Sequence, residues 1–272
     1  MVGKRVKTLI AALLLYYPGL LVASGLSLTP PALSWIGEQV FRNECASRRV
    51  CLVHWNEGEA FPSLGIGHFI WYPEGTGGRF TESFPALLAY LSAEGVPLPA
   101  WLAEAEGAPW PDRESFLQQA AHSDQVEELR QLLYETRGLQ VLFILQRARH
   151  SRELVVAAAP AGEQAVLGRR LDQLVQTPGG AYALLDYVNF KGEGLAPGER
   201  YDGEGWGLLQ VLQAMDQSPG DTVLEQFRDA AGRVLTRRAE LAPASIERER
   251  WLPGWLKRVE TYREPAPQAL KE

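Results

Sequence analysis

The stretch that decides the fold runs from Asn43 to His68 and reads NECASRRVCLVHWNEGEAFPSLGIGH. Just before it, apolar residues at helical spacing over 32–46 predict a helix that ends near Glu44, with Ser34 able to cap its start. From residue 52 to residue 72, short apolar runs alternate with Gly, Asn and Pro, which predicts a small hairpin or irregular sheet. The sequence therefore puts a carboxyl group at a helix end, directly before a β element.

The remainder of the chain is dominated by helical periods. Apolar residues at 139–145 are dense enough for a strand, but their neighbours favour one long helix, with Gly138 as the place for a kink. We expect an α+β fold that is predominantly α-helical, with a small β-hairpin after the first helix, in a single domain over 25–272 that carries a helical insertion at about 82–176. Further helices are expected near 82–94, 113–121, 123–148, 150–158, 163–176, 180–190, 206–217, 221–240 and 246–262.

The first 25 residues predict export. Basic residues at positions 4, 5 and 7 precede an apolar run over 9–23, and small residues close that run. This order is typical of a secretory signal peptide, here residues 1–24, and Pro18 argues against a membrane-spanning helix. An N-terminal anchor that is not cleaved is the alternative. Both predict that the rest of the chain is periplasmic or secreted, and no later segment is apolar enough to span a bilayer. Pro30 and Pro31 are expected to end the leader.

The charge balance bears on the binding partners. The chain has 27 Lys and Arg against 33 Asp and Glu, and removal of residues 1–24 leaves 24 against 33, a net charge of −9. Nucleic-acid binding depends on cationic surface, so we expect no nucleic-acid partner. The same charge repels an anionic polymer and attracts a cationic one.

Two cysteines, Cys45 and Cys51, enclose a short Arg-rich loop. In an oxidising compartment they are expected to form a disulfide, and a pair of buried thiols is the alternative. His54 is the only histidine close to them in sequence, and no zinc-type spacing follows, so no metal site is expected.

The carboxyl groups around the β element suit glycoside hydrolysis. One acid must protonate the leaving oxygen, which requires a raised pKa in an apolar setting, and a second carboxylate must activate water or stabilise positive charge at the sugar carbon. Glu44 is the candidate acid, with Trp55 or Trp71 expected to cover it. Glu57 and Glu59 are the candidates for the second carboxylate.

The residues SLGIGH, from Ser63 to His68, resemble the T-I-G-x-G-H signature of phage-type lysozymes. The resemblance implies that Glu44 matches the catalytic Glu, that Glu57 takes the place of the family's Asp, and that Ser63 replaces its Thr while keeping a water-positioning hydroxyl. His68 matches the structural His of the signature, and we also count it among the substrate-binding candidates. Glu at 57 and a longer gap after Glu44 depart from the family. The alternative for SLGIGH is a plain tight turn.

A second stretch resembles a related group. WGLLQV, from Trp206 to Val211, resembles the G-L-M-Q-[IV] motif of lytic transglycosylases and goose-type lysozymes, although it stands much further from the acid than in those enzymes. Gln210 can donate to and accept from a sugar amide or hydroxyl. Glu193 and Glu204 lie in glycine-rich loops and are candidates for substrate binding or the second carboxylate, with ordinary solvated loop acids as the alternative.

Tryptophans can stack on sugar rings or fill the core. Trp71 and Trp206 are the expected cleft residues, whereas Trp251 and Trp255 are expected in the core. The expected activity is cleavage of peptidoglycan, by hydrolysis or transglycosylation, without a cofactor. A chitosanase-like hydrolase of a cationic amino-sugar polymer is one alternative, and a non-catalytic glycan-binding or envelope protein with a lysozyme-like fold is another. Protein partners cannot be inferred from the sequence.

Overall fold

The computed structural model describes residues 28–271 except residues 79, 121 and 218–219. The expected signal peptide, residues 1–24, lies outside the described residues. The described chain is predominantly helical with a small antiparallel sheet, as expected from the sequence. Within these residues, no helix has both the length and the apolar character that crossing a bilayer requires.

The first part of the chain contains one helix, the sheet and four shorter helices. In order these are α1 (Pro30–Cys45), the 3-10 turn η1 (Arg49–Leu52), β1 (Val53–His54), β2 (Ser63–Leu64), β3 (Phe69–Ile70), α2 (Phe84–Ala93), α3 (Ala100–Ala103), α4 (Arg113–Ala120) and α5 (Asp124–Glu135).

The second part is almost entirely helical. It contains α6 (Arg137–Ala157), α7 (Ala161–Leu174), α8 (Pro178–Lys191), a hairpin of β4 (Arg200–Tyr201) and β5 (Glu204–Gly205), α9 (Leu208–Ala214), η2 (Met215–Gln217), α10 (Val223–Leu241), the π-helical turn η3 (Glu247–Trp251), α11 (Leu252–Val259) and η4 (Pro267–Leu270).

Helix α1 begins earlier than the sequence pattern predicts. The hydroxyl of Thr29 accepts a hydrogen bond from the backbone N–H of Ala32, so Thr29 caps the helix and the expectation for Ser34 is wrong. Pro30 and Pro31 form the first turn instead of ending a leader, because a helix's first N–H groups need no intrahelical partner.

The long helix predicted over 123–148 is two helices. Helix α5 ends at Glu135 and α6 begins at Arg137, with the buried Thr136 between them. Helix α6 then continues through the boundary predicted near residue 149. Its start packs closely on α1, because an added side-chain carbon on Gly37 would lie 2.9 Å from Cβ of Arg137. Tertiary packing between α1 and α6 therefore sets this boundary.

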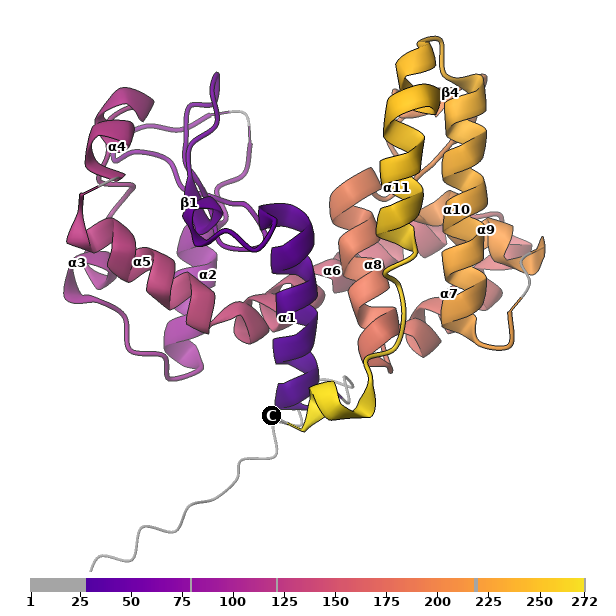
Figure 1. Ribbon diagram of the computed structural model, residues 1–272, viewed down its shortest axis with the longest axis horizontal. Coiled ribbons are helices and arrows are strands. Elements are labelled where there is room, and N and C mark those ends of the chain that lie inside the picture. The colour runs from indigo at the N-terminus through magenta and orange to yellow at the C-terminus, as the bar shows by residue number, and fades with distance from the viewer. Residues whose placement is uncertain (1–27, 79, 121, 218–219, 272) are drawn as a thin grey trace, which may run out of the picture.

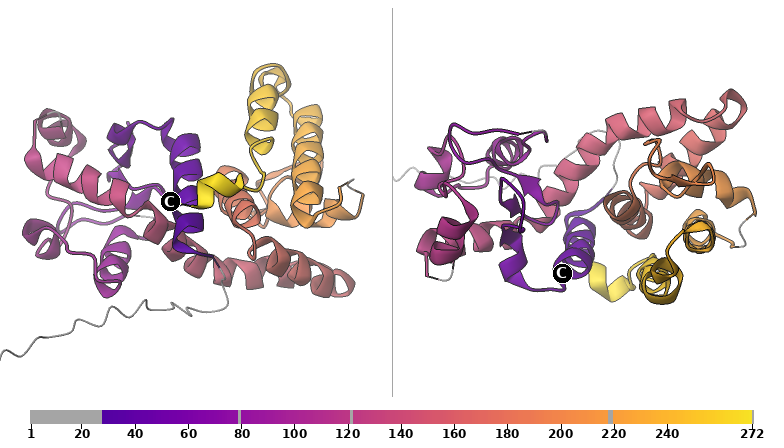
Figure 2. Two further views of the ribbon diagram at one scale, coloured as in Figure 1. Left: turned by 60° about the horizontal axis from the view of Figure 1, so that its bottom comes forward. Right: turned by 90° about the horizontal axis from the view of Figure 1, so that it is seen from above.

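The three-stranded sheet has the order β1-β2-β3 and is antiparallel throughout. Ser63 on the central strand pairs with His54 on β1 and with Ile70 on β3. Figure 1 shows the sheet and helices α2 to α5 on one side of α1, and helices α7 to α11 on the other. Helix α6 runs from the first group to the second (Figures 1 and 2). One continuous apolar core passes through both groups, so the end of α1 lies where the two groups meet.

Candidate functional site

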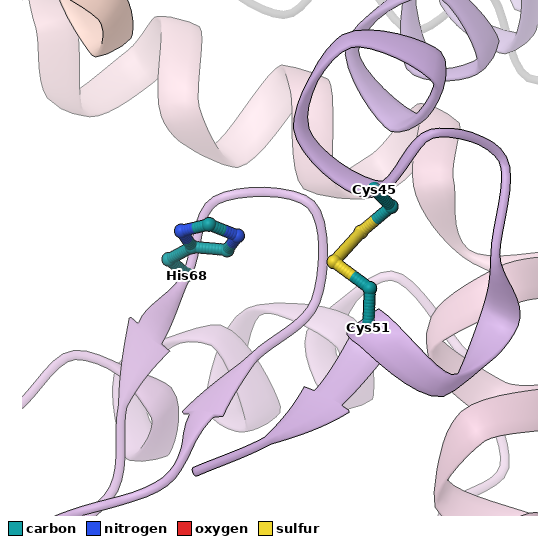
Figure 3. A group of neighbouring side chains, drawn as sticks. All are labelled: Cys45, Cys51 and His68. Carbon is teal, nitrogen blue, oxygen red and sulfur yellow. A yellow bond between two sulfur atoms is a disulfide. The ribbon is translucent and has the colours of Figure 1, made fainter. Parts of the chain in front are cut away.

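Glu44 lies on the last turn of α1, and its neighbour Cys45 is bonded to Cys51. This disulfide, which the sequence predicts, ties the end of the helix to the start of the sheet, so the buried-thiol alternative is wrong. Figure 3 shows the His68 ring beside the two sulfur atoms. The ring nitrogens of His68 and the two sulfurs lie within 4.8 Å of one another. Both sulfurs are engaged in the disulfide, so only reduction would release thiolates able to bind a metal.

The setting of Glu44 differs from the expected one. Its carboxylate forms an ion pair with the guanidinium of Arg258 on α11, and both side chains are 18% exposed. Trp55 and Trp71 do not cover it. They lie fully buried in the core, against Phe116 in one case and against Phe84 and Trp110 in the other. The expectation of an apolar pocket around Glu44 is therefore wrong, because a charged side chain and not an indole lies against its carboxylate.

The arginine that binds Glu44 is itself held by a fully buried carboxylate, Asp186 of α8. Nε and one terminal nitrogen of Arg258 each donate to Asp186 at 2.8 Å. Tyr262 and Asn43 donate the other two hydrogen bonds, at 2.8 and 3.0 Å. Burial on its own would lower the pKa of Arg258, but Asp186 and Glu44 raise it overall. The two carboxylates and one guanidinium carry a combined charge of −1, and Glu44 is the partly exposed member.

Neither Asp186 nor Arg258 is among the site residues that the sequence predicts. One signal for Asp186 was present, because it is the single charge in the apolar run from Tyr182 to Val188. A charge in such a run requires a buried partner. Nothing local identifies that partner as Arg258, which lies 72 residues further along the chain.

On the sheet, the structure brings Glu59 and Ser63 together. The Ser63 hydroxyl is buried and lies 3.5 Å from a carboxylate oxygen of Glu59, which also accepts a hydrogen bond of 3.0 Å from Asn56. Glu57 is exposed and makes no hydrogen bond to the described residues. Glu59 is thus the oriented acid of this loop, whereas the resemblance favours Glu57.

The SLGIGH turn has a packing explanation. Gly65 has φ +67°, and an added side-chain carbon there would lie 2.4 Å from the buried side-chain oxygen of Gln140. That oxygen accepts a hydrogen bond from the backbone N–H of Ile66 at 3.0 Å. The glycine is therefore required by the close approach of α6. His68, with φ +47°, is exposed at the end of the turn.

The second candidate stretch is engaged within the protein. The side-chain oxygen of Gln210 accepts from the N–H of Gly207 at 3.0 Å, and its nitrogen donates to the carbonyl of Gly194 at 3.2 Å. The expectation that this amide is available for a sugar is therefore wrong, since it caps α9 and joins two loops. Glu204 forms two hydrogen bonds with Arg237, which lower the pKa of that carboxyl. Glu193 is partly buried.

The tryptophan expectations are also corrected. Trp71 is 1% exposed, and Trp206 is packed between Tyr201, at 4.7 Å, and Arg238, at 4.0 Å. Neither offers a free face to a sugar. Trp251, which the sequence pattern assigned to the core, is 45% exposed.

Trp251 lies beside Trp255, with ring centroids 6.1 Å apart. Positions 251, 255 and 258 are spaced so that they follow one side of a helix. Arg258, the partner of Glu44, and the exposed Trp251 therefore lie on the same side of this helical segment. A separate groove of about 610 Å³ lies between α10 and α11 and is lined by charges of both signs, including Arg228 and Glu240.

Comparison with known proteins found no matching family model, no matching curated protein and no matching solved structure.

Proposed function

We propose that the chain has a lysozyme-like fold and cleaves glycosidic bonds in an amino-sugar polymer, with peptidoglycan as the substrate and Glu44 as the residue that transfers the proton. A helix-terminal Glu followed directly by a small sheet, and then by helices, supports this assignment. The Cys45–Cys51 disulfide supports a site of action outside the cytoplasm, where such bonds persist.

The observation that carries the proposal is the group of Glu44, Arg258 and Asp186. A buried ion pair is weak evidence for stability, because desolvation of the charges offsets much of their attraction. Here the pair also fixes the position of a third, partly exposed group, since the same terminal nitrogen of Arg258 contacts both carboxylates. Asp186 already neutralises Arg258, so the negative charge of Glu44 is the uncompensated one. A partly exposed carboxylate held in place by a buried ion pair is a candidate functional group.

The mechanism must differ from the one expected from sequence. Glu44 is paired with Arg258 in the free protein, so this pair has to open before the carboxyl group can act as the acid. Glu44 then gives its proton to the glycosidic oxygen as the bond from that oxygen to the sugar carbon breaks. Glu59, held by Asn56, takes a proton from the water that adds to the sugar carbon.

Two other functions have a specific observation in their favour. The ion pair between Glu44 and Arg258, which occupies the candidate acid, favours a non-catalytic glycan-binding protein. The net charge of −9 after removal of residues 1–24 favours a chitosanase-like enzyme on a cationic polymer.

The test uses the chain from residue 25, incubated separately with purified sacculi and with chitosan, followed by mass spectrometry of the soluble products. Wild type should release murein fragments, and Glu44→Gln should lower the rate by about 100-fold or more. Glu59→Gln should also lower it, whereas the exposed loop acid variant Glu106→Gln should match wild type. A hydrolytic end and an anhydro end differ by one water, so the same spectra separate hydrolysis from transglycosylation.

Each alternative has its own result. Release from chitosan alone would establish the chitosanase-like activity and overturn the murein assignment. Binding of sacculi without any products would identify a glycan-binding protein. Full activity of Glu44→Gln would remove Glu44 from the mechanism.

A further inference from the structure

Lys191, the last residue of α8, has an amine without an oxygen partner. The residue is only 9% exposed. Its Nζ lies 3.5 Å from the ring centroid of Trp255 and 4.1 Å from that of Phe190. Among the described residues, no carboxylate, carbonyl or hydroxyl accepts a hydrogen bond from it. The nitrogen is not among the fully buried polar atoms that lack a partner, so solvent reaches it and a ligand oxygen could use its hydrogen-bonding capacity.

The charges around Lys191 come from three other elements. Arg238 on α10 and Arg258 on α11 repel a protonated amine, and Glu247 on η3 attracts it. Glu247 is already engaged, because Arg238 donates to it at 2.9 Å and the hydroxyl of Tyr201 at 2.7 Å. Burial, followed by the repulsion from Arg238, lowers the pKa of Lys191 to about 7. Because this pKa is close to neutral pH, a bound anion would shift the amine to its protonated form.

The choice of lysine at this position is unusual for this chain. Lysine occurs at only five positions, and two of them lie in the expected signal peptide; the five are Lys4, Lys7, Lys191, Lys257 and Lys271. Arginine supplies nearly all the other cations, and its guanidinium does not lose its proton in proteins. Unlike a guanidinium, an amine can be neutral when empty and charged when occupied.

Lys191 is close to the Glu44 site. The ring of Phe190 contacts both Nζ of Lys191, at 4.1 Å, and the guanidinium of Arg258, at 4.4 Å. Arg258 in turn binds Glu44. The exposed Trp251 stands next to Trp255, on which the amine rests. A polymer bound at Glu44 and along α11 would pass this amine.

We propose that the amine of Lys191 binds a carboxylate carried by the glycan, so that the site selects an acidic amino sugar over a neutral or cationic one. This inference rests on the proposed function, because it takes the polymer to lie across Glu44. The carboxylate supplies the oxygen acceptor that Nζ lacks and forms a charge-assisted hydrogen bond with it. Lactyl-bearing N-acetylmuramic acid has such a group, whereas chitosan and N-acetylchitooligosaccharides do not.

The first experiment compares two ligands that differ in this group. One is a peptide-free tetrasaccharide of alternating N-acetylglucosamine and N-acetylmuramic acid, and the other is N-acetylchitotetraose. Binding is measured by calorimetry in the Glu44→Gln background, to prevent cleavage. The acidic ligand should bind more tightly, and adding Lys191→Met should weaken its binding by about 10- to 100-fold, with little effect on the neutral ligand. The exposed Lys257→Met serves as the matched control.

The second experiment needs no substitution at 191 and so stays informative if Lys191→Met does not fold. With a pKa of about 7, the empty amine is half protonated at pH 7, and binding of a carboxylate should draw in about half a proton. Calorimetry of the Glu44→Gln variant at pH 7, in buffers of different ionisation enthalpy, measures this uptake without a contribution from Glu44. N-acetylchitotetraose should cause none.

Equal affinity for both ligands, or an unchanged preference in Lys191→Met, would overturn the role of Lys191. These results are independent of catalysis. If wild type binds the acidic ligand through Lys191 but releases no products from sacculi, the cleavage proposal fails and the binding site stands. If sacculi are cleaved but the acidic ligand is not preferred over the neutral one, the role of Lys191 fails and the cleavage proposal stands.

Discussion

Asp186 is a fully buried carboxylate that receives four hydrogen bonds, and only those from Arg258 bring a compensating positive charge. This arrangement makes Arg258 serve two purposes. It satisfies a charge that could not otherwise be buried, and it holds Glu44 in place. Substitutions at Arg258 therefore affect both stability and the candidate site. Of the three charged residues, Glu44 is the one whose substitution should not greatly lower the free energy of unfolding.

We expect Arg258→Met to lower the free energy of unfolding by about 3–5 kcal/mol, because it leaves Asp186 buried without a cation. Urea titration followed by circular dichroism measures the change. Arg263→Met, which removes an exposed pair with Glu260, should cost about 0–1 kcal/mol. Adding Asp186→Asn to Arg258→Met should restore part of the loss. A cost for Arg258→Met no larger than that for Arg263→Met would contradict this account.

Lys191 predicts a particular dependence of stability on pH. Its pKa is about 7 in the folded protein against an ordinary value of 10.5, so between these values the unfolded chain binds more protons. Stability from this group therefore rises with pH across that window, and below pH 7 the folded state carries the full cost of a buried charge. Lys191→Met removes that cost.

The thermal midpoint should therefore increase more for Lys191→Met at pH 6 than at pH 10, relative to wild type at each pH. Differential scanning calorimetry at both values makes the comparison. Lys257→Met, at an exposed position on α11, should show no such difference. A pH-independent effect of Lys191→Met would mean that the amine keeps its ordinary pKa.

Helix α9 owes its position to two glycines and a cap. An added side-chain carbon on Gly207 would lie 2.1 Å from the backbone nitrogen of Gly194, so these loops touch through their backbones. Gln210 bonds to both glycines and closes the arrangement. A motif that resembles a substrate-binding element thus has a structural purpose in this chain, which is to join the loop after α8 to the start of α9.

Gly207→Ala should be destabilising by about 1–3 kcal/mol, because the added methyl group forces the two loops apart. Gly198→Ala is a suitable control, since no atom lies within 4 Å of its added carbon. Chemical denaturation of both variants provides the measurement. If Gly207→Ala were as stable as Gly198→Ala, the close contact between the loops would be wrong.

The ribbon has two groups of helices, yet the apolar core is continuous. Buried side chains of α1, α6 and α8 belong to the same cluster as those of the sheet and of α10. Helices α1 and α6 pack against each other, and α6 runs from the first group to the second. The residues around Glu44 come from α1, α8 and α11, so they keep their geometry only while the two groups stay packed together.

We expect the chain to unfold in one cooperative transition. Far-UV circular dichroism and tryptophan fluorescence should give coincident urea curves, because tryptophans of both groups, such as Trp110 and Trp255, lie in the shared core. A curve with two steps, or a fluorescence transition that precedes the loss of helix, would instead indicate two units that fold separately.

Local patterns in the sequence were enough to predict the helical character, the β element after the first helix, most helix positions and the Cys45–Cys51 disulfide. These features depend on periodicity, turn residues and short separations along the chain. Glu44 was recognisable as a helix-terminal acid for the same reason.

The partner of Glu44, the burial of Trp71 and the exposure of Trp251 were not predictable in this way. Arg258 is 214 residues from Glu44 in sequence, and the two meet only because α1, α8 and α11 pack around Asp186. Whether a carboxyl is protonated, or a tryptophan is accessible, depends on neighbours contributed by distant segments. Periodicity carries no information about those neighbours, so the electrostatics of the candidate site emerged only from the packing of the folded chain.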